Sequence, residues 1–314
     1  MKTLPRAVRA AALATAAALA LTACQGGGSS DAQSSGQAPA GSSSAGASAA
    51  PSASGPDATA SAGPSGDAAA DSAALKPGTN HSAAADGYAY PAKDVHDWLW
   101  GRKAKSPTYP KKKLAFLTFD DGPTNSTPRT LKELKKAGVP ASFFIIGGDK
   151  GLGRPKSAGY LKDEIAQGNS VCIHSYTHSF PLLYPGRTAS PKAIVKDYTK
   201  TVSAVRDVLG EDYRVGCQRY PGGHGWNGMK PADRAMQKKG AWWIDWNSEN
   251  GDGTDTASST GAGRAKQALS TLGSNPRVAV ILMHDYKDND ATIESIAPLV
   301  KALKKKGYDF GVMS

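Results

Sequence analysis

The sequence contains no apolar run long enough to cross a bilayer: the Ala/Leu-rich run at residues 10–21 falls short of the roughly 20 residues that a spanning helix needs. It also shows no repeat of the length found in solenoids or propellers, so one large domain is expected rather than an array. The formal net charge is +11, yet no basic run is interleaved with aromatic residues. Nucleic acid is therefore not expected as a partner, and the positive charge suits an anionic wall polymer or a membrane surface.

The N-terminus has the order of an export signal. Three basic residues precede the apolar run, and small residues follow it. The sequence Leu21-Thr22-Ala23-Cys24 resembles the lipobox of bacterial lipoproteins, in which the cysteine becomes the lipidated first residue of the mature protein. We therefore predict a signal peptide over residues 1–23 and a lipid anchor on Cys24, which would hold the protein on the outer side of the cell membrane. An ordinary cleaved signal with an incidental cysteine is the alternative.

Residues 24–86 consist almost entirely of Ala, Ser, Gly and Pro after the cysteine. A segment of this composition buries too little apolar surface to offset its chain entropy, so we predict a disordered linker. Its root-mean-square span is on the order of 45 Å, enough to lift a domain from a membrane into a surrounding wall. A tether of this kind indicates a local substrate.

Strand-like and helix-like segments alternate through residues 112–314, which we expect to form the main folded domain. Each helix-like segment is followed by a glycine, a frequent helix terminator. The alternation predicts a parallel sheet, most naturally a distorted (β/α)7 barrel with its site at the C-terminal ends of the strands; an open doubly wound sheet is the second choice. Residues 87–111 are expected to be a lead-in that packs on the barrel. The predicted strands are residues 114–119, 141–147, 170–174, 214–219, 241–246, 278–284 and 309–313, and the predicted helices are residues 127–137, 157–167, 190–209, 231–239, 262–272 and 292–306.

Reactive side chains fall at the ends of these predicted strands. Asp120 and Asp121 end the first strand, His174 ends the third, and His178 follows four residues later. Two histidines and one carboxylate form a metal-ligand set with positions left for water and substrate. We therefore predict that Asp121, His174 and His178 bind a divalent metal. Zinc is the default ion, and iron, cobalt or nickel also suit this set.

Four motifs in this order resemble those of the NodB-homology polysaccharide deacetylases, carbohydrate esterase family four. They are Thr118-Phe119-Asp120-Asp121-Gly122-Pro123, His174-Ser175-x-x-His178, Arg219-x-Pro221 and Leu282-Met283-His284-Asp285. The resemblance spans about residues 112–314. It implies a distorted (β/α) barrel, a divalent metal and hydrolysis of N-acetyl groups on aminosugar polymers.

The resemblance also implies roles for individual residues. Asp120 would be the base that takes a proton from the attacking water, with Arg219 holding it oriented and ionised. His284 would be the acid that protonates the leaving amine, with a pKa raised by a carboxylate such as Asp252 or Asp285. The backbone N–H of Gly222 would bind the oxyanion.

The sugar-binding groove departs from the family pattern. Many relatives have an aromatic residue after the proline of the third motif, where this chain has Gly222-Gly223. The wall of the sugar-binding groove that this aromatic residue would form is therefore absent here, or His224 or Trp226 forms it instead. Tyr220 and Trp246 are further candidates for substrate contact, whereas Trp242 and Trp243 fit the core better.

Two cysteines remain besides Cys24. Cys172 and Cys217 each stand two residues before a motif residue, so each should share that residue's strand face on adjacent strands. Outside the cytoplasm they could form a disulfide or stay as two buried thiols.

The leading functional hypothesis is a monomeric N-deacetylase of peptidoglycan, acting on N-acetylglucosamine or N-acetylmuramic acid. The lipid anchor, the linker and the basic surface favour it over a chitooligosaccharide deacetylase or an O-acetyl (xylan-type) esterase. A catalytically silent glycan-binding module is the alternative from another class, but none of the family's catalytic residues is missing.

Overall fold

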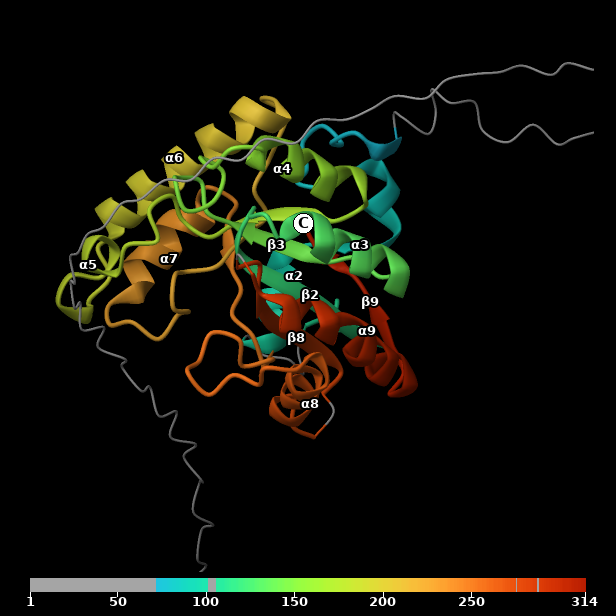
Figure 1. Ribbon diagram of the computed structural model, residues 1–314. Helices are drawn as coiled ribbons and strands as arrows, with labels where there is room; N and C mark the ends of the chain where they lie inside the picture. Colours follow the sequence, from blue (N-terminus) through green and yellow to red (C-terminus); the bar gives the residue numbers. More distant parts are fainter. Residues whose placement is uncertain (1–71, 101–105, 275, 287) are drawn as a thin grey trace, which may run out of the picture. The chain divides into compact units, whose positions relative to one another are not determined.

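The computed structural model describes residues 72–100, 106–274, 276–286 and 288–314 (Figure 1). Among these residues we find no helix with the length and apolar character of a membrane span. The predicted signal peptide, the lipid anchor at Cys24 and the linker up to residue 71 lie outside the described residues.

A parallel sheet of eight strands forms the centre of the domain. Its order is β6-β5-β4-β3-β2-β8-β7, and β9 pairs with the first residues of β2. The end strands β6 and β7 do not pair with each other among the described residues, so the curled sheet is an incomplete barrel. The predicted distorted barrel is therefore confirmed, with β7 as a strand that the sequence did not indicate. The strands are β2 (Lys113–Gly122), β3 (Ser142–Ile145), β4 (Ser170–Ile173), β5 (Cys217–Gln218), β6 (Trp242–Trp243), β7 (Ser248–Glu249), β8 (Val278–His284) and β9 (Tyr308–Phe310).

Six helices match the predicted ones to within a few residues, and they surround the strands (Figure 1). In the first, Leu131 and Leu134 are buried on one face, and Gly138 ends the helix in the left-handed region at φ 62°. A short helix, α5 (Phe180–Leu183), and one in the lead-in, α2 (Ala92–Leu99), were not predicted. The six are α3 (Thr127–Ala137), α4 (Ser157–Ala166), α6 (Pro191–Leu209), α7 (Met229–Gln237), α8 (Gly261–Thr271) and α9 (Asp290–Lys305).

The two faces of β2 belong to different parts of the core. Leu117 and Phe119 pack with the surrounding helices, whereas Leu114 and Phe116 face the interior of the barrel. Because side chains alternate along a strand, Asp120 continues the interior row beyond Phe116. The carboxylate of Asp120 therefore lies inside the carboxyl end of the barrel, which is called the mouth from here on.

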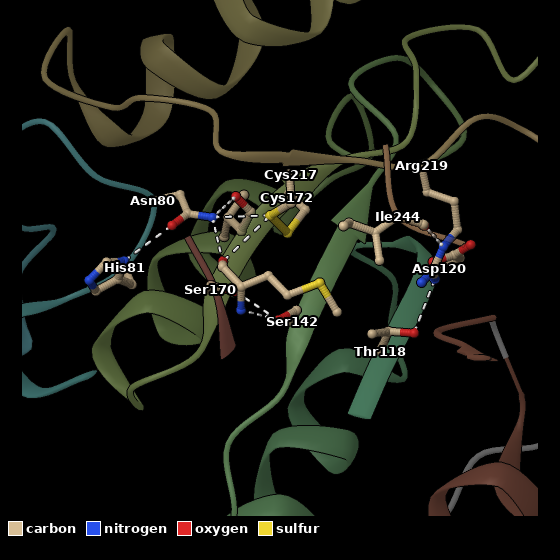
Figure 2. Close-up of a disulfide and its surroundings, with 12 residues drawn as sticks. Asn80, His81, Thr118, Asp120, Ser142, Ser170, Cys172, Cys217, Arg219 and Ile244 are labelled. Atoms are coloured by element: carbon tan, nitrogen blue, oxygen red, sulfur yellow. Dashed lines mark hydrogen bonds and ion pairs between the residues drawn. A yellow bond between two sulfur atoms is a disulfide. The ribbon is translucent and has the colours of Figure 1, made fainter. Parts of the chain in front are cut away.

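The interior row of β4 and β5 contains a disulfide between Cys172 and Cys217 (Figure 2). The sequence left open whether these cysteines form a disulfide or stay as two buried thiols, and the structure has the disulfide. Two residues further along each strand the same row reaches His174 and Arg219. The disulfide thus joins the two strands directly below two residues of the predicted site.

Residues 72–86 fold onto the amino ends of the strands, so the predicted end of the linker at residue 86 is wrong. Asn80, His81 and Ser82 are buried. The side-chain amide of Asn80 donates hydrogen bonds to the carbonyl groups of Val171 (3.1 Å) and Met313 (3.0 Å). Apolar burial in this segment is limited to small contributions such as those of Leu75 and Ala85, and hydrogen bonds hold the rest, which explains why its composition gave no sign of order.

The lead-in packs against the barrel as predicted, within its described residues. A 3-10 helix, η1 (Ala83–Tyr88), leads to β1 (Ala89–Tyr90), which pairs in parallel with β10 (Val312–Met313). Helix α2 then buries Val95 and Trp98 against the interior cluster. Both described ends of the chain therefore close the amino end of the barrel.

Candidate active site

The three predicted metal ligands meet at the carboxyl ends of β2 and β4. Oδ1 of Asp121 lies 3.5 Å from Nε2 of His174 and 3.4 Å from Nε2 of His178. One potential ligand atom from each residue lies within 4.8 Å of the others. The spacing suits a single ion between them.

Hydrogen bonding around His174 shows that these atoms fit a cation. Its Nδ1 lies 2.9 Å from the carbonyl oxygen of Arg219, which can only accept, so Nδ1 carries the proton and Nε2 keeps its lone pair. Burial, with the nearby His178, lowers the pKa of His174 to about 3 and keeps the ring neutral. Oδ1 of Asp121 is buried and has no hydrogen-bond partner among the described residues. An unpaired carboxylate oxygen facing an imidazole lone pair is stabilised by a divalent metal.

The turn between the two histidines is held by Asp197 of α6. Ser175 and His178 have φ angles of 75° and 47°, in the left-handed region that costs energy for residues with a side chain. The carboxylate of Asp197 accepts hydrogen bonds from the backbone N–H of Tyr176 and from the hydroxyl of Thr177 (2.6 Å). Asp197 was not predicted to belong to the site. The sequence feature that could have indicated its role is an acid standing alone on the apolar face of a helix, three residues after Ile194.

Asp120 and Arg219 form an ion pair within the barrel mouth (Figure 2). Nη1 of Arg219 lies 2.6 Å from Oδ1 of Asp120 and also donates to the hydroxyl of Thr118 (3.0 Å). Its Nε donates to the carbonyl oxygen of Ile244 (2.8 Å), which fixes the plane of the guanidinium group. Burial raises the pKa of Asp120 despite the opposing charge of Arg219. Oδ2 of Asp120 faces the ligand cluster, 3.6 Å from Nε2 of His174.

His284, at the end of β8, pairs with Asp252 and not with Asp285. Nδ1 of His284 lies 2.7 Å from Oδ1 of Asp252, and its backbone N–H donates to Oδ2 of the same residue (2.8 Å). Burial opposes protonation of His284, but the hydrogen bond and the charge of Asp252 outweigh it, and the pKa rises to about 9. The hydroxyl of Thr292 and the amide of Asn289 hold Asp252 in place.

Asp285 belongs to the buried region behind the site. It accepts a hydrogen bond from the hydroxyl of Thr127 at the start of α3. Burial raises the pKa of Asp285 to about 7. Of the two carboxylates proposed as partners of His284, the structure therefore selects Asp252.

Aromatic side chains form a wall beside Gly222. A Cβ atom on Gly222, which has φ 73°, would lie 3.2 Å from the ring of Trp226. Phe180 of α5 is 42% exposed, and its ring centre lies 5.4 Å from those of both Trp226 and His178. Trp226 rather than His224 therefore supplies the wall, because His224 turns away to bind Asp233 (2.9 Å). The sequence did not indicate Phe180.

Of the remaining residues predicted to contact the substrate, Tyr220 is buried, whereas Trp246 and the backbone N–H of Gly222 are accessible. The predicted contact of the Tyr220 side chain with substrate is wrong, because its ring is buried in the core and its hydroxyl donates a hydrogen bond to Asp233 (3.2 Å). Trp246 is partly exposed beside Gly223, and the guanidinium carbon of Arg219 lies 5.5 Å from its ring centre. The backbone N–H of Gly222 donates to no group among the described residues, so it is available to a ligand.

Comparison with known proteins assigns this site to a family. Residues 108–239 match the family described as Polysaccharide deacetylase. A solved Streptococcus mutans CE4 esterase aligns with a TM-score of 0.70 at 35% identity and covers 77% of this chain and 99% of its own. The chain belongs to the polysaccharide deacetylase family. It is accordingly a hydrolase of N-acetyl groups.

Two curated relatives extend the comparison. This polysaccharide deacetylase is 31% identical over 203 residues to YheN, a candidate polysaccharide deacetylase of Bacillus subtilis, covering 64% of this chain and 67% of that protein. It is 28% identical over 202 residues to a peptidoglycan-N-acetylglucosamine deacetylase of Bacillus cereus, covering 64% and 69%. Enzymes of this family generally use a divalent metal, in keeping with the cluster of Asp121, His174 and His178.

Proposed function

We propose that this chain is a zinc-dependent enzyme that removes N-acetyl groups from the aminosugars of peptidoglycan at the outer side of the cell membrane. The observation that carries the proposal is the pairing of two acid–base groups around one metal-ligand cluster. Asp120 is paired with Arg219, and His284 is paired with Asp252. The peptidoglycan deacetylases among the relatives support the choice of polymer.

The two pairs have complementary tasks. A divalent ion bound by Asp121, His174 and His178 would polarise the acetyl carbonyl and acidify water. Because Arg219 occupies Oδ1 of Asp120, Oδ2 remains to take the proton from the attacking water. The Gly222 N–H would stabilise the oxyanion as the tetrahedral species forms.

His284 completes the reaction at the leaving group. Its Nδ1 is bound by Asp252, so Nε2 is the nitrogen that can donate a proton to the departing amine. A pKa of about 9 keeps the ring protonated at neutral pH. Breaking of the C–N bond then yields acetate and a free amino sugar.

Export and anchoring are the part of the proposal that rests on the N-terminal residues alone. A Cys24→Ala variant is expected to appear in the soluble extracytoplasmic fraction, whereas the unaltered protein stays with membranes. Equal distribution of the two proteins would contradict a lipid anchor on Cys24.

The test of the activity is acetate release from purified peptidoglycan, chitopentaose and acetylxylan, each with added zinc, cobalt or nickel and with chelator. Metal-dependent acetate and new free amines from peptidoglycan are expected. Release mainly from chitopentaose would reassign the enzyme to chitooligosaccharides, and release mainly from acetylxylan would make it an O-acetyl esterase. No release from any of the three despite bound metal would favour a glycan-binding module.

Two variants separate the roles of neighbouring residues. Asp120→Asn should keep the metal and lose turnover, because the ligand cluster is intact but its base is absent. His174→Ala should lose both, measured as metal content after gel filtration. Full activity in either variant would refute the assignment.

A further inference from the structure

A groove of about 320 Å³ lies beside the turn that carries the two histidine ligands. Thr177, between His174 and His178, forms part of one wall, and α6 forms another. Leu182 of α5, which is 49% exposed, lines it as well. One wall of the groove is therefore part of the turn that carries His174 and His178.

Three lysines of α6 line this groove at a spacing of four residues. Lys192, Lys196 and Lys200 are all exposed and stand on one face of the helix. None of them has an ion pair with a described acid. Like charges four residues apart on a helix repel each other, so this row lowers helix stability when it has no counter-charge.

Asp197, the one acid among the described residues that line the groove, does not neutralise the row. The carboxylate of Asp197 is buried and accepts hydrogen bonds from the backbone and the hydroxyl of Thr177. Lys200 lies over the ring of Tyr176, with Nζ 5.4 Å from the ring centre, which directs it toward the histidine turn. The groove is consequently positive, and its positive side adjoins the metal-ligand turn.

We propose that this lysine row binds the carboxylates of the peptides attached to the glycan strand, so that the enzyme prefers peptide-bearing peptidoglycan over bare sugar chains. This inference rests on the proposed function, since it specifies which form of the polymer the site takes. Lysine ammonium groups are mobile point charges that suit several flexible carboxylates better than one rigid ligand. The exposed apolar side chain of Leu182 offers contact to the sugar or peptide beside them.

The test compares two substrates in steady-state kinetics, using the whole protein loaded with zinc. One is a glycan fragment with intact peptides, free of wall teichoic acid, and the other is the same fragment after an amidase has removed the peptides. In the triple variant Lys192→Gln/Lys196→Gln/Lys200→Gln, KM for the peptide-bearing fragment is expected to rise on the order of tenfold, about twofold for each exposed contact. The kcat value, and KM for the stripped fragment, should not change.

A matched control removes the same charge elsewhere. Lys266, Lys301 and Lys305 are exposed and lie on α8 and α9, away from α6 in Figure 1. Their triple Gln variant should keep the KM of the unaltered protein for both fragments. An equal rise in KM in the control would assign the effect to net charge and overturn the proposal.

Failure of this inference differs from failure of the proposed function. If the unaltered protein deacetylates both fragments with equal KM, or the α6 triple variant keeps the preference, the lysine row has no such role although the enzyme acts on peptidoglycan. If neither fragment releases acetate, the proposed function fails. Calorimetric binding of the peptide-bearing fragment then still decides the role of the row: binding that the α6 variant weakens supports it, and unchanged binding refutes it.

Discussion

Replacing Asp252 with asparagine should move the alkaline limb of the pH–rate profile by more than about two units. His284 has a pKa of about 9 because the hydrogen bond and charge of Asp252 outweigh the effect of burial. Asparagine keeps the size of the side chain and removes the charge, so the pKa of His284 should fall to its ordinary value of 6.5 or below. At pH 8 the protonated fraction then drops from about 0.9 to about 0.03, a loss of about thirtyfold in kcat/KM.

The assay is kcat/KM for acetate release between pH 5 and pH 10 at saturating zinc, with bound zinc measured at each pH. Asp255→Asn is the matched control, because Asp255 is an exposed acid three residues away in the same loop. The control should keep the alkaline limb of the unaltered enzyme. An Asp252→Asn profile that coincides with it would refute the assignment of His284 as an acid tuned by Asp252.

Three further predictions concern stability and can be measured by denaturant unfolding. Arg219→Met should lower the free energy of unfolding by about 3–5 kcal/mol, because it leaves the buried Asp120 unpaired; a loss below about 1 kcal/mol would contradict this. Replacing Cys172 and Cys217 together by alanine should lower it by up to about 4 kcal/mol, since the disulfide closes a loop with a sequence separation of 45; adding reductant to the unaltered protein should give the same loss, and the variant should not respond to it. Glu164→Met should be stabilising at pH 7, because burial raises the pKa of Glu164 well above 4.5 and neither carboxyl oxygen has a partner among the described residues. A raised pKa favours folding at low pH, so the gain should shrink as the pH falls toward 4.5, and a gain that grows there would exclude this cause.

The parts of the fold that the sequence predicted well are those with long apolar patterns. β8 and α3 have the predicted bounds, since seven and eleven residues carry enough burial to show a period. β7 has only two residues, one serine and one glutamate, and forms because its backbone pairs with β8. Pairing of this kind depends on a neighbouring strand and leaves no local pattern.

The residues of the candidate site could be predicted because most of them stand at, or directly after, the carboxyl ends of strands. The partners that hold these residues were harder to find. Asp252 follows β7 by a short loop, and its contact with His284 spans 32 positions. Asp197 and Phe180 lie on helices, where the sequence shows an acid and an aromatic residue without showing what they face. Long-range contacts set these roles, and spacing along the chain does not encode them.

The segment around Asn80 lies at the end of the barrel opposite the catalytic mouth. Asn80 contacts residues at the amino ends of the strands, whereas Asp121 and His284 stand at the carboxyl ends. The described part of the chain, which begins at residue 72, therefore enters the domain at the amino end of the barrel, opposite the mouth. Immobilising the domain by a short, rigid attachment at residue 72 would therefore leave the mouth facing away from the support and open to a polymeric substrate.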